Sequence, residues 1–84
     1  MERGNDDPGQ VAPREGRYAN SFQVGHNAFE FFLDFGQVSP ESAEVRFHSR
    51  IIAGPVFAKV LAKLLQESLD RYEQTFGPIP QDNV

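Results

Sequence analysis

The hydrophobic pattern of this chain changes its period once, at Gly54-Pro55. Before that point apolar and polar residues alternate along three segments, and after it apolar residues recur every three or four positions. Alternation is typical of a strand with one buried face, whereas the longer spacing is typical of an amphipathic helix. The pattern therefore predicts an α+β fold, in which a three-stranded antiparallel meander is followed by one long amphipathic helix.

The expected strands lie within residues 18–24, 29–35 and 43–52. The residues that alternate on one shared face are Tyr18, Asn20, Phe22, Val24, Phe29, Phe31, Leu33, Phe35, Val45, Phe47, Ser49 and Ile51. A two-residue turn at His26-Asn27 would join the first two strands and place Phe22 opposite Phe31. On the opposite face, the register that aligns the apolar residues pairs Asp34 with Arg46, Phe32 with His48 and Glu30 with Arg50.

The helix is expected from Pro55 to Phe76, because proline suits the first helical position and Gly77-Pro78 is a strong stop signal. At about 100° per residue, its apolar sector spans roughly 200°. A helix on one sheet needs a stripe only about 100° wide. The excess flank consists of Ala58, Ala62, Leu65, Leu69 and Phe76. Because the chain has one helix, we expect these residues to form a subunit interface, and dimerisation to complete the fold.

The length of 84 residues allows one domain with a marginal core. We place that domain at residues 18–77, between a disordered N-terminal tail (1–17) and a short C-terminal tail (78–84). The N-terminal tail is rich in Gly, Pro and charge and has little to bury. Disulfides cannot stabilise the chain, because it has no cysteine.

Charge and hydropathy indicate the location and exclude some partners. The net charge is −4 and the pI about 5.0, which argues against bulk, sequence-independent binding of nucleic acid. No apolar stretch approaches the roughly 18 residues that would indicate a membrane span, and no signal peptide is expected. These features predict a cytoplasmic protein without membrane contact.

No catalytic or metal-binding constellation is visible. Asp34 and Glu30 share one strand face, but ion pairs with neighbouring arginines explain them on a solvated surface. His26 and His48 are distant and lie in no cluster with metal-ligand spacing. We expect a non-enzymatic chain with no cofactor and no metal.

The candidate binding face is the side of the sheet that carries Phe32. Its residues are Phe32, Arg46, His48, Arg50 and Gln23. A basic stripe with an aromatic residue is similar to the platforms that bind single-stranded nucleic acid. The alternative is an ordinary outer face, on which Glu30 and Asp34 cancel the basic charge.

Several short motifs resemble a family of small bacterial and archaeal proteins, domain-of-unknown-function family 3467. They are Tyr18-Ala19-Asn20, Phe22 to His26, Phe29-Glu30-Phe31, Leu33 to Gly36, His48 to Ile52 with Pro55, Leu65-Gln66-Glu67, and Tyr72-Glu73 through Phe76 to Ile79. The resemblance implies no mechanism. The order of the elements is also loosely similar to SecB-type export chaperones, a likeness of fold only.

These observations favour a non-enzymatic, oligomeric module or adaptor that binds a protein or peptide. Exposed sheet edges allow strand addition, and the side of the sheet that carries Phe32 offers an aromatic contact. The alternative is a dimer that binds nucleic acid through the basic and aromatic residues of that side.

Overall fold

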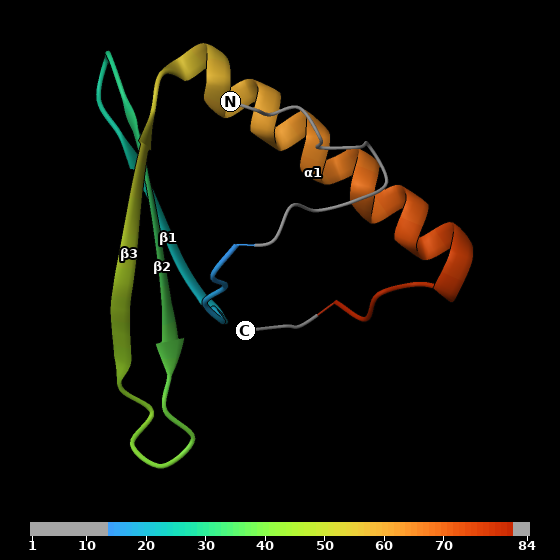
Figure 1. The fold of residues 1–84 in the computed structure, drawn as a ribbon, viewed down its shortest axis with the longest axis horizontal. Coiled ribbons are helices and arrows are strands. Elements are labelled where there is room, and N and C mark those ends of the chain that lie inside the picture. Colours follow the sequence, from blue (N-terminus) through green and yellow to red (C-terminus); the bar gives the residue numbers. More distant parts are fainter. Residues whose placement is uncertain (1–13, 82–84) are drawn as a thin grey trace.

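The computed structural model describes residues 14–81 and has the α+β fold that the pattern predicts. Its elements are β1 (Ser21–His26), β2 (Phe31–Val38), β3 (Val45–Ala53) and α1 (Pro55–Phe76) (Figure 1). The strands form an antiparallel sheet in the order β1-β2-β3, so β1 and β3 are its edges within the described part of the chain. Most of the predicted N-terminal tail and the end of the predicted C-terminal tail lie outside the described residues.

The hairpin between β1 and β2 is longer than the predicted two-residue turn. Residues 27–30 form the loop, and the Oδ1 atom of Asn27 accepts hydrogen bonds from the backbone N–H groups of Phe29 and Glu30, both at 2.8 Å. The backbone N–H of Asn27 also donates to the carbonyl of Glu30 at 2.9 Å. The predicted pairing of Phe22 with Phe31 is therefore wrong. Phe22 lies opposite Phe35, and His26 lies opposite Phe31.

The pairing of β2 with β3 contains a β-bulge that the alternation did not predict. Phe35 pairs with Ser49 and Gly36 pairs with Phe47, so His48 is the extra residue on β3. A bulge reverses the side on which the following residues of the strand lie. The predicted register is wrong as well, by four positions, which the one-residue bulge does not explain: Asp34 pairs with Arg50 rather than Arg46, and Phe32 pairs with Ile52 rather than His48.

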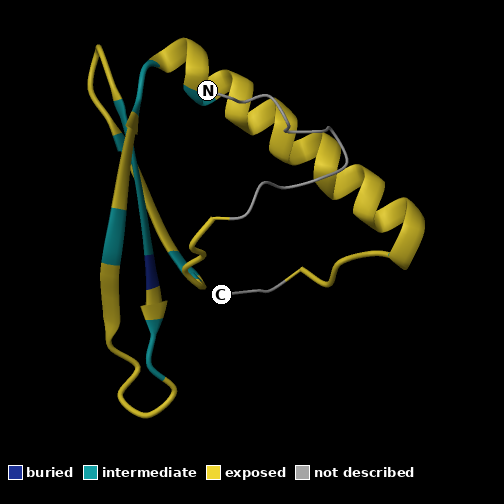
Figure 2. Ribbon diagram, viewed as in Figure 1, coloured by how far each residue is buried: buried dark blue, intermediate teal, exposed yellow. Residues whose placement is uncertain are grey.

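The absence of a side chain at Gly36 permits this bulge. A Cβ atom at this position would lie 2.8 Å from the Cα of Phe47 and would collide with the carbonyl oxygen of Arg46. Real Cβ atoms essentially never approach this closely. Gly36 is also the one buried residue among those described (Figure 2).

The two sides of the sheet differ in their residues. The inner face comprises Phe22, Val24, Phe31, Leu33, Phe35 and Ile51. The outer face comprises Gln23, Phe32, Asp34, Arg50, Ile52 and Phe47. Phe47 and Ile51, predicted to share a face, lie on opposite sides because the bulge stands between them. The inner face is apolar at its centre, although His26, Ser49, Gln37 and Arg46 also lie on this side. The outer face mixes charged with apolar residues.

Helix α1 extends away from the end of the sheet and packs against no strand (Figure 1). A single residue, Gly54, separates β3 from Pro55 at the start of the helix. At the other end Gly77 has a φ of 100° and its N–H donates to the carbonyl of Glu73, which closes the last turn. No residue of α1 is buried, and no hydrophobic side chain of the described chain lies in a core (Figure 2).

The hydropathy of α1 is also relevant to the membrane prediction. Within residues 14–81, no helix is both long enough and apolar enough to cross a membrane.

Candidate functional site

The first candidate interaction surface is the apolar stripe of α1. The predicted interface residues all lie on this helix: Ala58, Ala62, Leu65, Leu69 and Phe76. Leu65 is 57% exposed and Phe76 is 72% exposed, and Ala58 alone among the five is half-buried. The rest of the stripe, including Phe57 at 69%, is exposed as well. The whole apolar sector, and not only its predicted excess flank, is therefore open in a single copy.

The inner face of the sheet is the second uncovered apolar surface. Phe22 and Val24 on β1 are both 63% exposed, and Ile51 on β3 is exposed too. The ring of Phe22 packs edge-on against Phe35, with centroids 5.9 Å apart. This aromatic contact joins neighbouring strands but leaves the face itself open to a partner.

The outer face is organised around Arg50. Its Nε atom donates to Oδ1 of Asp34 at 2.7 Å and its Nη2 atom donates to Oδ2 at 2.9 Å. These bonds lower the pKa of the Asp34 carboxyl from its ordinary value of 3.8. The same guanidinium lies over the ring of Phe32, with Cζ 5.4 Å from the ring centroid. Phe32 is half-buried, Ile52 lies opposite it on β3, and Phe47 lies farther along the same face, opposite Gly36.

The bulge separates the residues of the predicted basic stripe. The outer face contains Phe32, Gln23 and Arg50, as predicted. Arg46 pairs with Gln37, which is three positions from Asp34 on β2 and therefore on the other side of the sheet. The structure does not bring Arg46 and Arg50 onto one face.

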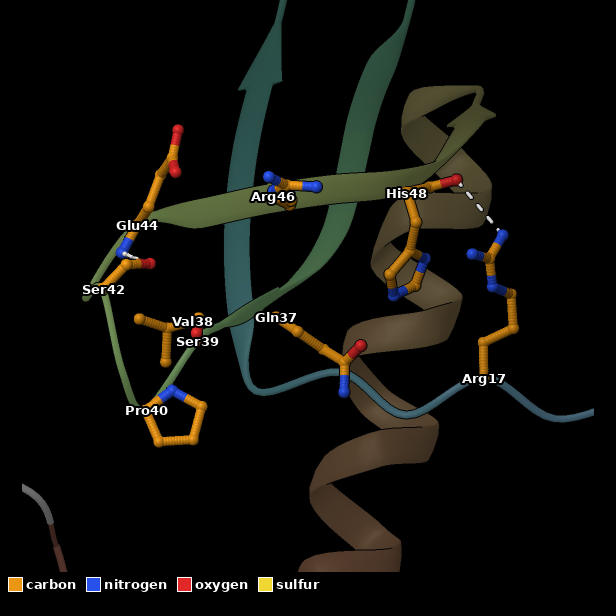
Figure 3. Close-up of a pocket in the computed structure, with 9 residues that line it drawn as sticks. All are labelled: Arg17, Gln37, Val38, Ser39, Pro40, Ser42, Glu44, Arg46 and His48. Atoms are coloured by element: carbon orange, nitrogen blue, oxygen red, sulfur yellow. Dashed lines mark hydrogen bonds between the residues drawn. The ribbon is translucent and has the colours of Figure 1, made fainter.

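Arg46 and His48 instead line a cleft at the end of the sheet farthest from α1. We call it the bulge cleft; its volume is about 480 Å³ and its lining residues are Arg17, Gln37, Val38, Ser39, Pro40, Ser42, Glu44, Arg46 and His48 (Figure 3). Residues that precede β1, the loop after β2 and the start of β3 all contribute to it. Its formation depends on the bulge, because the bulge is what directs His48 away from the regular pairing.

His48 connects this cleft to the segment that precedes β1. Its Nε2 atom donates to the carbonyl oxygen of Tyr18 at 3.1 Å, and its Nδ1 atom lies 2.7 Å from the hydroxyl of Ser49. The guanidinium of Arg17 donates to the backbone carbonyl of His48 at 3.4 Å. No local sequence signal marks Arg17 as a site residue, because it lies within the segment predicted to be disordered. Its position depends on contacts with residue 48, far along the chain.

Metal-binding geometry is absent from the part of the chain that the structure describes. Residues 14–81 contain no group of three or more His, Asp or Glu side chains that could hold a metal ion. The clefts at the surface of the described residues are lined by both polar and apolar side chains.

Comparison with known proteins identifies the family. Residues 9–81 match the family described as Protein of unknown function (DUF3467). The chain belongs to the DUF3467 family. The matched region includes the bulge cleft, the whole sheet and α1, and it begins inside the predicted N-terminal tail. No curated protein and no solved structure matches the chain, and the looser likeness to SecB-type export chaperones is not supported.

Proposed function

We propose that this chain is a non-enzymatic, homodimeric protein-binding module of the cytoplasm, in which the helix of each copy covers the inner face of the other copy's sheet. One observation supports the dimer above all: α1 has 22 residues, and none of them is buried. Helices in proteins are stabilised mostly by packing of an apolar face, and an isolated helix is marginal in water. A second packing surface is therefore required.

The connection between β3 and α1 disfavours packing of α1 on the sheet of its own copy. Connections that return a helix onto its own sheet usually span two to six residues. Here Gly54 alone links Ala53 to Pro55, and its backbone is extended, with φ −66° and ψ 160°. Proline then fixes φ at the first helical position. This short, stiff connection holds α1 away from the sheet of the same copy.

A second copy fits the two open surfaces in size. A helix of 22 residues is about 33 Å long, and strands of six to nine residues span roughly 20–30 Å. The exposed parts of Phe57, Tyr72 and Phe76 alone present roughly 400 Å² of aromatic surface. A standard interface buries about 800 Å² per partner. The exposed apolar surfaces of the helix stripe and the inner face together reach that area per copy.

Two-fold symmetry explains why both surfaces occur on one chain. In a two-fold dimer, the helix stripe of the first copy contacts the inner face of the second, and the helix stripe of the second copy contacts the inner face of the first. Exchange of the helices thus covers both stripes and both inner faces with one type of contact. An apolar stripe this large is rarely left open on a monomer.

The outer face and the sheet edges remain for a partner protein or peptide. Phe32, Ile52 and Phe47 provide apolar contacts, and the two edge strands allow strand addition. This face favours protein over nucleic acid, because Asp34 neutralises Arg50 and Arg46 lies on the other side. A nucleic-acid-binding dimer is the alternative function.

Paired cysteines test the exchanged dimer directly, since the natural chain contains none. Leu61 lies at the middle of the helix stripe and Leu33 at the middle of the inner face. The variant carrying both Leu33→Cys and Leu61→Cys should form a covalent dimer on mild oxidation. A disulfide within one chain would show that the helix returns to its own sheet, and absence of both products would also contradict the proposal. The control is Leu33→Cys with Gln66→Cys, which places the second thiol on the polar side of α1.

A further inference from the structure

The bulge cleft gathers hydrogen-bond donors from three separate segments. Arg17 precedes β1, Gln37 belongs to β2, and Arg46 and His48 belong to β3. Figure 3 shows the side chains of Arg17, Gln37 and His48 extending toward the same region. All the residues that line the cleft belong to one copy, so a second copy is not needed to form it.

Each guanidinium in the cleft keeps donors for a ligand. Arg17 uses Nη1 for the carbonyl of His48 at 3.4 Å, which orients it and leaves its other N–H groups available. Arg46 makes no side-chain hydrogen bond or ion pair with a described residue. Glu44 is the one carboxylate among the described lining residues, and no ion pair joins it to Arg46.

The formal charge of the bulge cleft is opposite in sign to the net charge of the whole chain. The whole chain carries a net charge of −4, yet two arginines and one glutamate line the cleft, a local formal charge of +1 with His48 neutral. A local positive site in an acidic protein favours a small, localised anion over an extended polyanion, because the surrounding negative charge repels the latter. The hydroxyl groups of Ser39 and Ser42 add donors at the rim.

We propose that the bulge cleft binds a phosphate monoester group, with the guanidinium groups of Arg17 and Arg46 as the principal donors. Guanidinium groups match the geometry of phosphate oxygens and form charge-assisted hydrogen bonds with them. The volume of about 480 Å³ exceeds that of a bare phosphate and accommodates the organic part of the ester as well. The source of the group is a small phosphorylated molecule or a phosphorylated side chain of a protein.

Backbone amide NMR of the full chain, titrated with O-phosphoserine, tests this site. Resonances of residues 37–48 should shift in a saturable way, and those of residues 59–71 on α1 should not. A phosphorylated peptide that binds more tightly than O-phosphoserine would identify a protein as the source, whereas equal affinities would identify a small molecule. Either result supports the phosphate site. A single-stranded oligonucleotide that shifts these resonances while O-phosphoserine does not would overturn it in favour of nucleic acid.

Charge-neutralising variants locate the site. Arg17→Gln and Arg46→Gln should each weaken O-phosphoserine binding about tenfold, the scale expected for loss of one charge-assisted hydrogen bond. Lys63→Gln, which removes the same charge from the polar side of α1, should leave the affinity unchanged. Equal affinities in all three variants, or no saturable shift in the natural chain, would contradict the proposal.

Discussion

Arg50 binds Asp34 through two parallel hydrogen bonds and at the same time covers the ring of Phe32. The two bonds measure 2.7 and 2.9 Å and join neighbouring strands. The carboxylate is largely shielded, with 12% of its side chain exposed, whereas Arg50 is 60% exposed. This arrangement neutralises the charge at the centre of the outer face and holds the aromatic ring in place.

The ion pair predicts a specific dependence of stability on pH. The hydrogen bonds from Arg50 hold the pKa of Asp34 below its ordinary value of 3.8, although desolvation acts in the opposite direction. A lowered pKa in the folded state means that the stabilisation is fully present above pH 3.8 and is lost as the pH falls through the lowered value. Denaturant unfolding should show Asp34→Asn less stable than the natural chain at pH 7. The difference should disappear at strongly acidic pH, and a constant difference would contradict this account.

Gly36 should be intolerant of any side chain. Gly36→Ala forces the carbonyl of Arg46 and the Cα of Phe47 away, so we expect a loss of about 1–3 kcal/mol in the free energy of unfolding. Gly25→Ala is the matched control, because a Cβ there meets nothing within 4 Å, and it should change stability by less than about 0.5 kcal/mol. Both are measured by denaturant unfolding at one protein concentration. Equal losses would show that the close approach at the bulge has no energetic consequence.

Phe32 should contribute to partner binding more than to folding. Phe32→Ala removes the ring beneath Arg50 and should weaken binding of a partner protein by about 1–3 kcal/mol. Phe29→Ala is the control, since Phe29 is exposed at the tip of the hairpin, away from the outer face. The measurement is capture from nuclease-treated lysate, followed by affinity determination for the captured protein. Equal affinities of the natural chain and both variants would show that Phe32 is a plain surface residue.

The elements and the helix boundaries could be predicted because their signals are local. The period of the hydrophobic pattern separates sheet from helix, and Gly54-Pro55 and Gly77-Pro78 delimit α1 from Pro55 to Phe76 as predicted. The sides of β1 and β2 were also predicted correctly despite the wrong register. The observed loop between β1 and β2 has four residues and the predicted turn had two. Because the difference is an even number, the pairing partners change but each residue stays on the predicted side of the sheet.

The strand pairing and the bulge cleft could not be predicted, because neither depends on local pattern alone. The alternation in residues 43–52 continues without interruption across His48, so nothing in β3 marks the bulge. A glycine inside a strand often marks a bulge or a close backbone approach, but the predicted strand ended at residue 35 and left Gly36 outside, whereas β2 continues to Val38. Without the bulge, Arg46 and Arg50 share a face and the cleft does not form. The uncovered helix was not predicted either: only the excess flank of its apolar stripe was expected to lie open in a single copy, whereas the whole stripe does.

Sedimentation equilibrium of the natural chain at micromolar concentration tests the central claim most directly. The exchanged dimer predicts a mass close to twice 9.4 kDa with no stable folded monomer. Leu65→Glu should lower the mass and reduce the helical circular dichroism together, whereas Gln66→Glu, one position away on the polar side, should change neither. A natural chain that sediments as a folded monomer at this concentration would contradict the account.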